Sequence, residues 1–293
     1  MSKSELEKLR AQMKAAPFSP TAPEWQLRAG IDALESFGLP DDVRVEICEL
    51  GAVPADRLTG GSGDGAVLLY LHGGGYVIGS PRSHRHLAAL IARQMAGTVY
   101  VLDYRLAPEA PFPAAVDDAL AAYRALLAEH PPQRLAIAGD SAGGGLTFAL
   151  AIAARDAGLA MPTAIVGISP WVNLGTENES YDKLAANDPV LSREVTEYFS
   201  SRYLAGAPAR TPLASPLFAN LAGLPPTLIQ VGDHECFFGD ATSMHQALIA
   251  AGVDTELVVW KGMFHVWHLY WPALGEGKQA LEQIAAFVTQ HCG

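Results

Sequence analysis

RLAIAGDSAG occupies residues 134–143 and joins an apolar strand, predicted from Arg134 to Ala138, to the start of a helix. The junction carries the pattern Gly139-x-Ser141-x-Gly143, which in a strand–turn–helix context lifts a nucleophilic serine onto a sharp turn. The following helix directs its positive dipole end at the place where negative charge would develop. The stretch therefore predicts Ser141 as a nucleophile, the alternative being a glycine-rich turn with a helix-capping serine.

Apolar strands alternate with helices through most of the remaining chain. Strands separated by helices of about ten to fifteen residues predict βαβ units and a mainly parallel sheet. Strands that are apolar on both faces fit a sheet with helices on both sides. Residues 57–65 are expected to form a glycine-rich turn. The predicted strands are 67–71, 98–102, 134–138, 163–168, 227–231 and 255–260, and the predicted helices are 83–95, 114–128, 146–157, 241–251 and 279–290.

Two regions depart from this alternation and predict a helical cap. Residues 171–221 hold many turn residues and one helical piece near 194–203. An insertion at the carboxyl side of a sheet is where a lid belongs. Residues 1–45 contain two amphipathic helical stretches, one with Leu6, Leu9 and Met13 on a face. We expect residues 1–45 to form part of the cap and residues 46–293 to form the catalytic domain, with 171–221 inserted as the lid.

A run of three glycines follows the strand at 67–71, in the sequence His72-Gly73-Gly74-Gly75. Glycine lets backbone N–H groups approach a ligand without obstruction by a Cβ atom. If Ser141 is a nucleophile, two of these N–H groups and that of Ala142 would form an oxyanion hole. The alternative is a phosphate-binding or structural loop, although both common nucleotide-binding patterns are absent. We interpret His72 as a residue that shapes the loop.

The general base and its acid should follow the nucleophile, because the order in this fold is Ser, acid, His. His265 lies just after the strand at 255–260 and is preferred to His268. The acid should lie after the strand at 227–231, where Asp233, Glu235 and Asp240 all qualify by spacing. Asp240 is expected to begin the next helix, where a carboxylate favours the positive dipole end.

Composition excludes several functional classes. The 20 Lys and Arg residues against 31 Asp and Glu residues give a net charge of −11, which disfavours binding to phosphate backbones. The three cysteines match no zinc pattern and predict reduced thiols. The N-terminal residues lack the apolar core of a secretory signal, and no apolar run has the length of a membrane span. We expect a cytoplasmic enzyme with no nucleic-acid partner, no metal and no membrane span.

Five motifs in order resemble the bacterial hormone-sensitive-lipase family of esterases, from Val67 to His265. This resemblance implies an α/β-hydrolase fold with a helical cap, and ester hydrolysis without a cofactor. It also implies Gly74 and Gly75 as oxyanion donors. The chain lacks the Asp-Pro-Leu turn of many members and is similar to the branch that uses Glu, which implies Glu235 as the acid, with Asp233 next. The motifs are HGGG at 72–75, DYRLAPE at 103–109, GDSAGG at 139–144, GLPPTLIQVG at 223–232 and GMFH at 262–265.

The function that follows is a carboxylesterase acting on small-molecule esters with short to medium acyl chains. An amide or formamide hydrolase with the same triad is the alternative, and a non-catalytic small-molecule-binding relative is a third. We interpret residues 103–109 as a buried charge network behind the site. A homodimer through an exposed edge strand is a further option. Aromatic residues that are candidates for lining the pocket, each more often a core residue, are Tyr76, Trp171, Phe237, Phe238 and Trp267.

Overall fold

The computed structural model describes residues 3–15 and 22–292. Within these ranges eight strands form one sheet in the order β1-β2-β4-β3-β5-β6-β7-β8. The six strands from β3 to β8 run parallel, whereas β1 and β2 pair antiparallel with each other, as do β2 and β4. The strands are β1 (Val43–Leu50), β2 (Val53–Gly60), β3 (Val67–Leu71), β4 (Thr98–Leu102), β5 (Leu135–Asp140), β6 (Ile165–Ile168), β7 (Thr227–Gly232) and β8 (Thr255–Trp260).

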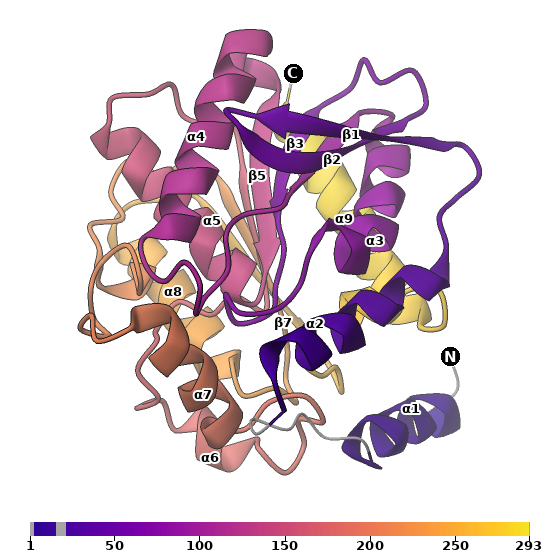
Figure 1. Cartoon of the computed structure of the whole chain (residues 1–293), viewed down its shortest axis with the longest axis vertical. Helices are drawn as coiled ribbons and strands as arrows, with labels where there is room; N and C mark the ends of the chain where they lie inside the picture. Colours follow the sequence, from indigo (N-terminus) through magenta and orange to yellow (C-terminus); the bar gives the residue numbers. More distant parts are fainter. Residues whose placement is uncertain (1–2, 16–21, 293) are drawn as a thin grey trace.

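Helices cover both faces of the sheet (Figure 1). On one face α3 (Pro81–Met95) packs against α9 (Gly275–His291) and strands β2 and β4. On the other face lie α4 (Ala114–Glu129), α5 (Ala142–Asp156) and α8 (Phe238–Ala250). Strands β3, β4, β5 and β7 are buried along their whole length, as the apolar runs predict. This arrangement is an α/β-hydrolase fold.

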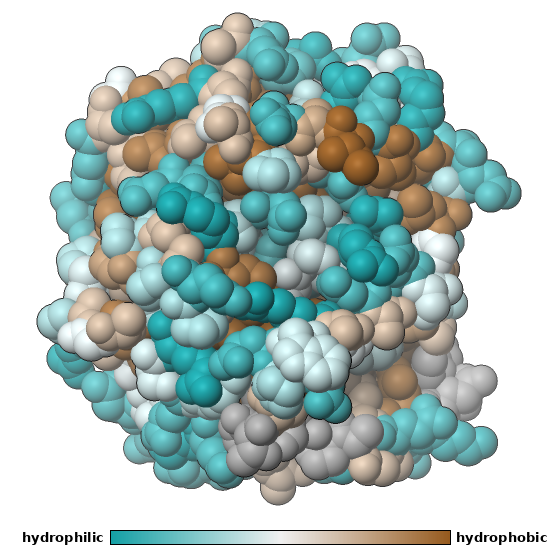
Figure 2. All heavy atoms as spheres, in the orientation of Figure 1, coloured by the Kyte–Doolittle hydropathy of each residue, from teal (hydrophilic) through white to brown (hydrophobic). Residues whose placement is uncertain are grey.

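The two N-terminal strands of the sheet were not predicted, and the prediction of a turn over residues 57–65 is wrong at its start. Residues 57–60 belong to β2 and pair with both β1 and β4. Strand β1 lies at an edge and alternates half-buried with exposed residues, and Ile47 is 86% exposed. Because β1 is an edge strand with many exposed residues, it lacks the apolar pattern by which the buried strands were predicted. In Figure 2 an apolar strip over β1 stands out from the surrounding polar surface.

Residues 103–109 do not form the expected buried charge network. Asp103, Arg105 and Glu109 are exposed. Arg105 pairs with Asp118 on α4, and Glu109 pairs with Arg28. The buried residues of this stretch are instead Tyr104 and Ala107, and the Tyr104 hydroxyl donates to the carbonyl of His72 at 2.6 Å. The motif therefore supports the loop after β3 through an aromatic hydroxyl.

Several helical segments gather beyond the carboxyl ends of the parallel strands, at the lower end of Figure 1. The apolar face of α1 formed by Leu6, Leu9 and Met13 packs against a cluster that includes Phe264 and Trp267. Within the described ranges, no helix combines the length and the apolarity needed to cross a bilayer. The segments at this end are α1 (Lys3–Ala15), α2 (Glu24–Asp32) with the 3-10 turn η1 (Ala33–Phe37), α6 (Ser180–Lys183) and α7 (Arg193–Leu204).

Candidate active site

Ser141 lies at the turn between β5 and α5 with a strained backbone, φ 53° and ψ −120°. Neighbouring main chain holds this conformation: the Ser141 N–H donates to Ile168 at 2.9 Å, and its carbonyl accepts from Trp171 at 2.9 Å. A Cβ atom at Gly139 would overlap the carbonyls of Gly143 and Leu71, and one at Gly143 would overlap that of Leu71. Both glycines are therefore required for the turn to form.

Three side chains from separate loops form a hydrogen-bonded chain. The Nε2 atom of His265 lies 2.9 Å from the Ser141 hydroxyl, and its Nδ1 atom lies 2.8 Å from Glu235 Oε2. Because a carboxylate only accepts, Nδ1 carries the proton and Nε2 is left as an acceptor facing Ser141. His265 is 5% exposed and Glu235 is fully buried. The structure brings together Ser141 and His265, which motif and order indicated, and Glu235, which the family resemblance implied.

The carboxylate of Glu235 is held on both oxygens. Its Oε1 atom accepts hydrogen bonds from the Ser169 hydroxyl at 2.8 Å and from the Gly232 N–H at 2.6 Å. Burial raises the pKa of Glu235, and its hydrogen bonds to His265 and Gly232 oppose that rise. The remaining oxygen, Oε2, is thereby directed at the imidazole ring of His265.

The competing acids and the competing histidine are engaged elsewhere. Asp233 accepts from the Gly262 N–H at 2.6 Å, and Asp240 accepts from the Asn173 N–H at 3.2 Å. His268 donates from Nε2 to the side-chain oxygen Oε1 of Gln230 at 2.8 Å, and burial lowers the pKa of His268 to about 3. His268 is consequently neutral and tied to the core rather than directed at Ser141.

The glycine loop after β3 faces the serine. Gly73, Gly74 and Gly75 all line the cavity that contains Ser141 and His265. Ala142 is the first residue of α5, a position whose N–H has no partner within its own helix. His72 shapes this loop as expected: its Nδ1 atom donates to the Gly73 carbonyl at 2.8 Å. Burial lowers the pKa of His72 to about 3, so the ring is neutral.

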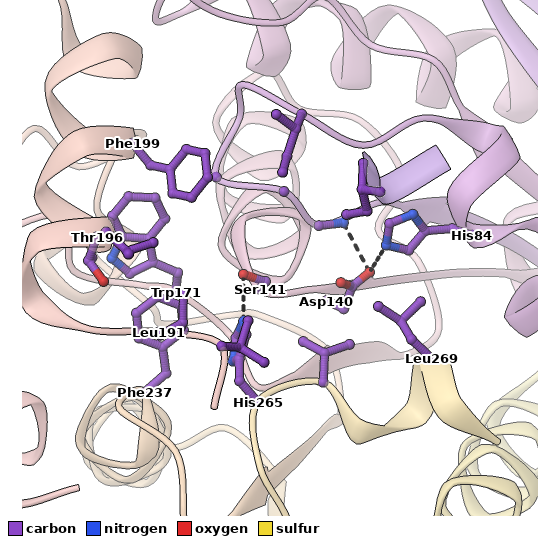
Figure 3. Close-up of a pocket in the computed structure, with 18 of the residues that line it drawn as sticks. His84, Asp140, Ser141, Trp171, Leu191, Thr196, Phe199, Phe237, His265 and Leu269 are labelled. Atoms are coloured by element: carbon purple, nitrogen blue, oxygen red, sulfur yellow. Dashed lines mark hydrogen bonds and ion pairs between the residues drawn. The ribbon is translucent and has the colours of Figure 1, made fainter. Parts of the chain in front are cut away.

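A cavity of about 240 Å3 opens over Ser141 (Figure 3). Trp171, Phe199 and Phe237 form one side of it, and His84, Asp140 and Leu269 lie on the other. Trp171 stacks on Phe237 with ring centroids 5.7 Å apart. The other residues that line the cavity are Gly30, Ile31, Leu34, Ile78, Val190, Leu191, Val195, Thr196, Val266 and Tyr270.

The aromatic predictions for the pocket are correct in part. Trp171 and Phe237 line it, whereas Tyr76, Phe238 and Trp267 are not among its lining residues. Tyr76, the candidate for substrate binding, packs instead in the core, where it is 1% exposed and its ring stacks on that of Tyr203 with centroids 3.7 Å apart. Sequence reasoning missed Phe199, and the only signal available was its place in the helix predicted at 194–203.

Comparison with known proteins identifies the family and the fold of the chain. A sequence model of a family with the α/β-hydrolase fold matches residues 68–269. An acetyl-hydrolase from Streptomyces hygroscopicus is 44% identical over 263 residues, which cover 89% of this chain and 87% of that protein. A crystal structure of an esterase from the bacterial hormone-sensitive lipase family superposes with a TM-score of 0.96 at 43% identity, covering all of both chains. A crystal structure of EstE5 soaked with p-nitrophenyl butyrate gives a TM-score of 0.94 at 42% identity, over 98% of each chain.

Proposed function

This chain belongs to the α/β-hydrolase family and resembles its bacterial hormone-sensitive-lipase esterases, and from that premise we propose that it is a carboxylesterase with a Ser141-His265-Glu235 triad. The observation that carries the proposal is the hydrogen-bonded chain from Ser141 Oγ through His265 to Glu235, with distances of 2.9 and 2.8 Å. The family membership supports ester hydrolysis, and the geometry supports the assignment of roles to these residues.

In the proposed mechanism His265 Nε2 takes the proton of Ser141 as Oγ attacks the ester carbonyl. Glu235 keeps the other ring proton on Nδ1 and stabilises the imidazolium that forms. Backbone N–H groups of Gly74, Gly75 and Ala142 hold the tetrahedral oxyanion. The imidazolium then donates its proton to the departing alcohol, which leaves an acyl group on Ser141. Water, deprotonated by the same base, attacks the acyl group and releases the acid and free Ser141.

The volume and the aromatic walls of the cavity favour small esters. A volume of about 240 Å3 is below the range of about 300–1,000 Å3 that is common for ligand pockets. Trp171, Phe199 and Phe237 enclose one side of it, and aromatic walls of this kind exclude water and accept an apolar chain. These features support an acetyl to short acyl group as the substrate moiety. The acetyl-hydrolase from Streptomyces hygroscopicus is consistent with that choice.

The same cavity supports a capping role for the two regions predicted to form a lid. Residues 1–45 contribute Gly30, Ile31 and Leu34 to its lining. Residues 171–221 contribute six more lining residues, from Trp171 to Phe199. Both regions thus supply walls, whereas the reacting groups lie on loops that follow β3, β5, β7 and β8. We treat 1–45 and 171–221 as the cap of a catalytic domain spanning 46–293.

Hydrolysis of p-nitrophenyl butyrate by the purified protein, beside its Ser141→Ala variant, tests this function. We expect turnover that the variant abolishes, together with fluorophosphonate labelling of the wild type alone. The corresponding anilide, with the same acyl group, should be cleaved far more slowly if the enzyme is an esterase. A folded wild type that cleaves neither compound, and is not labelled, would overturn the proposal.

A further inference from the structure

A buried carboxylate lies directly beside the nucleophile and takes no part in the triad. Asp140, the residue before Ser141, is 1% exposed. Its Oδ1 atom accepts from the Tyr70 hydroxyl at 2.8 Å and from the Gly73 N–H at 3.0 Å. The second of these bonds fixes the His72–Gly73 peptide, at the start of the glycine loop. Asp140 therefore connects the nucleophile turn to the glycine loop.

His84 on α3 supplies the third contact of this carboxylate. Its Nε2 atom lies 3.4 Å from Asp140 Oδ1, and the His84 ring is fully buried on the wall of the cavity (Figure 3). Burial disfavours the charged form of Asp140, but contact with His84 and Tyr70 keeps the pKa of Asp140 below its ordinary value. The carboxylate is thus ionised at neutral pH.

The opposite nitrogen of His84 indicates which protons the ring carries. Nδ1 lies 2.8 Å from the Ser83 hydroxyl oxygen, and the same hydroxyl lies 2.8 Å from the Ser80 carbonyl, to which it can donate its single proton. The Ser83 oxygen is then an acceptor for an N–H at Nδ1. Nε2 lies 3.4 Å from Asp140 Oδ1 without a well-directed hydrogen bond, and this contact is favourable when Nε2 carries a proton. With a proton on each nitrogen the ring would be an imidazolium.

The other titratable groups near His84 do not compete with Asp140 for contact with a charged His84 ring. Tyr70 on β3 has its ring centroid 6.3 Å away, and the neutral His72, in the loop after β3, has its ring centroid 5.5 Å away. On its own helix, His86 donates to the Leu269 carbonyl at 2.8 Å, and burial lowers its pKa to about 4. Of these groups, Asp140 is the anion that lies within contact distance of the His84 ring.

We propose that His84 is a positioning residue of the esterase reaction, which as an imidazolium neutralises Asp140 and holds that carboxylate on the Gly73 amide. The proposal rests on the proposed function. Without His84, a bare buried carboxylate would lie next to Ser141, where the developing oxyanion also carries negative charge. Two like charges in a site of low dielectric repel strongly. The His84–Asp140 ion pair removes that repulsion and holds the glycine loop in position relative to Ser141.

Four variants test the proposal by kinetics: His84→Gln, Asp140→Asn, the double variant, and His86→Gln as a control at another buried histidine of the same helix. Gln at position 84 leaves Asp140 unpaired, and removal of one partner of a buried pair is what costs most. We expect kcat for p-nitrophenyl butyrate to fall about tenfold or more in His84→Gln, with a smaller change in KM. Asn at position 140 keeps an acceptor for Gly73, so the double variant should recover activity above that of His84→Gln.

Nitrogen-detected NMR of the histidine rings gives an independent readout, with His84→Gln as the assignment control. We expect both ring nitrogens of His84 to be protonated at pH 7. One unprotonated nitrogen, or a double variant whose loss equals the product of the two single losses, would overturn the proposal. A wild type without esterase activity overturns the proposed function and the positioning role together, and the spectra still decide whether the ion pair exists.

Discussion

Replacement of Glu235 by Gln separates hydrogen-bond geometry from charge at the triad. The Oε1 side of Glu235 is met by two donors, the Ser169 hydroxyl and the Gly232 N–H. A glutamine must therefore present its carbonyl oxygen to that side and its NH2 group to His265. Two donors would face each other unless the His265 proton moves from Nδ1 to Nε2. That tautomer points a proton at Ser141 and cannot accept one.

The expected loss follows from this tautomer. A neutral amide in place of the triad acid lowers kcat by about 10⁴ in a comparable triad, which equals about 5.5 kcal/mol in the activation free energy. Steady-state hydrolysis of p-nitrophenyl butyrate measures it. Thermal unfolding should show no loss of stability, because burial raises the pKa of Glu235 and the amide removes a charge whose burial is unfavourable.

Asp233→Asn is the matched control, since Asp233 accepts a single N–H, from Gly262, and an asparagine oxygen can do the same. Its kcat should stay close to that of the wild type. A Glu235→Gln enzyme that keeps a tenth of the wild-type kcat would refute the tautomer argument. A collapse of kcat in Asp233→Asn instead would transfer the role of acid to that residue.

Three further predictions concern the turn, a buried acid and the pocket wall. Gly143→Ala should abolish turnover, because the added Cβ overlaps the Leu71 carbonyl; turnover with unchanged kcat would contradict the steric account. Burial raises the pKa of Asp240 to about 8, far above its unfolded value of about 3.9. Between about pH 4 and 8 the native state binds one more proton at Asp240 than the unfolded state, so the stability of the wild type falls as pH rises. The melting temperature of Asp240→Asn should therefore rise relative to that of the wild type over this range. A difference in melting temperature that does not change with pH would refute this. Phe199→Ala removes a wall of the cavity and should raise kcat/KM for p-nitrophenyl octanoate relative to the acetate, whereas an unchanged ratio would place the acyl chain elsewhere.

The central part of the fold could be predicted because its signals are local. Buried parallel strands appear as continuous apolar runs, and the Gly139–Gly143 motif is recognisable in the sequence because the turn excludes side chains at both positions. Strand β1 could not be predicted in the same way. It has one neighbour and one half-buried face, so its pattern is that of an exposed segment. Its pairing with β2 depends on a sheet formed by residues far along the chain.

The site residues also differ in whether a local sequence pattern could predict them. Ser141 and His265 follow from motif and order, while spacing alone left three carboxylates as candidates for the acid. The structure shows Glu235 directed at His265 by Ser169 and Gly232, contacts that no spacing rule contains. Tyr76 packs in the core against Tyr203, which is the more frequent of the two roles that the sequence left open for it. The pocket wall at Phe199 depends on how α7 docks, which no local pattern predicts.

The atoms that confine the turn at Ser141 belong to the main chain. Gly143 abuts the carbonyls of Leu71 and His72, and the Ser141 N–H donates to the carbonyl of Ile168. Every amino acid supplies a carbonyl, so substitutions at Leu71 or Ile168 can alter the core without removing the groups that aim the hydroxyl. The orientation of Ser141 is therefore insensitive to substitutions of the surrounding core residues. Descendants of this sequence can exchange neighbouring core residues, and with them thermal stability, while the nucleophile keeps its orientation.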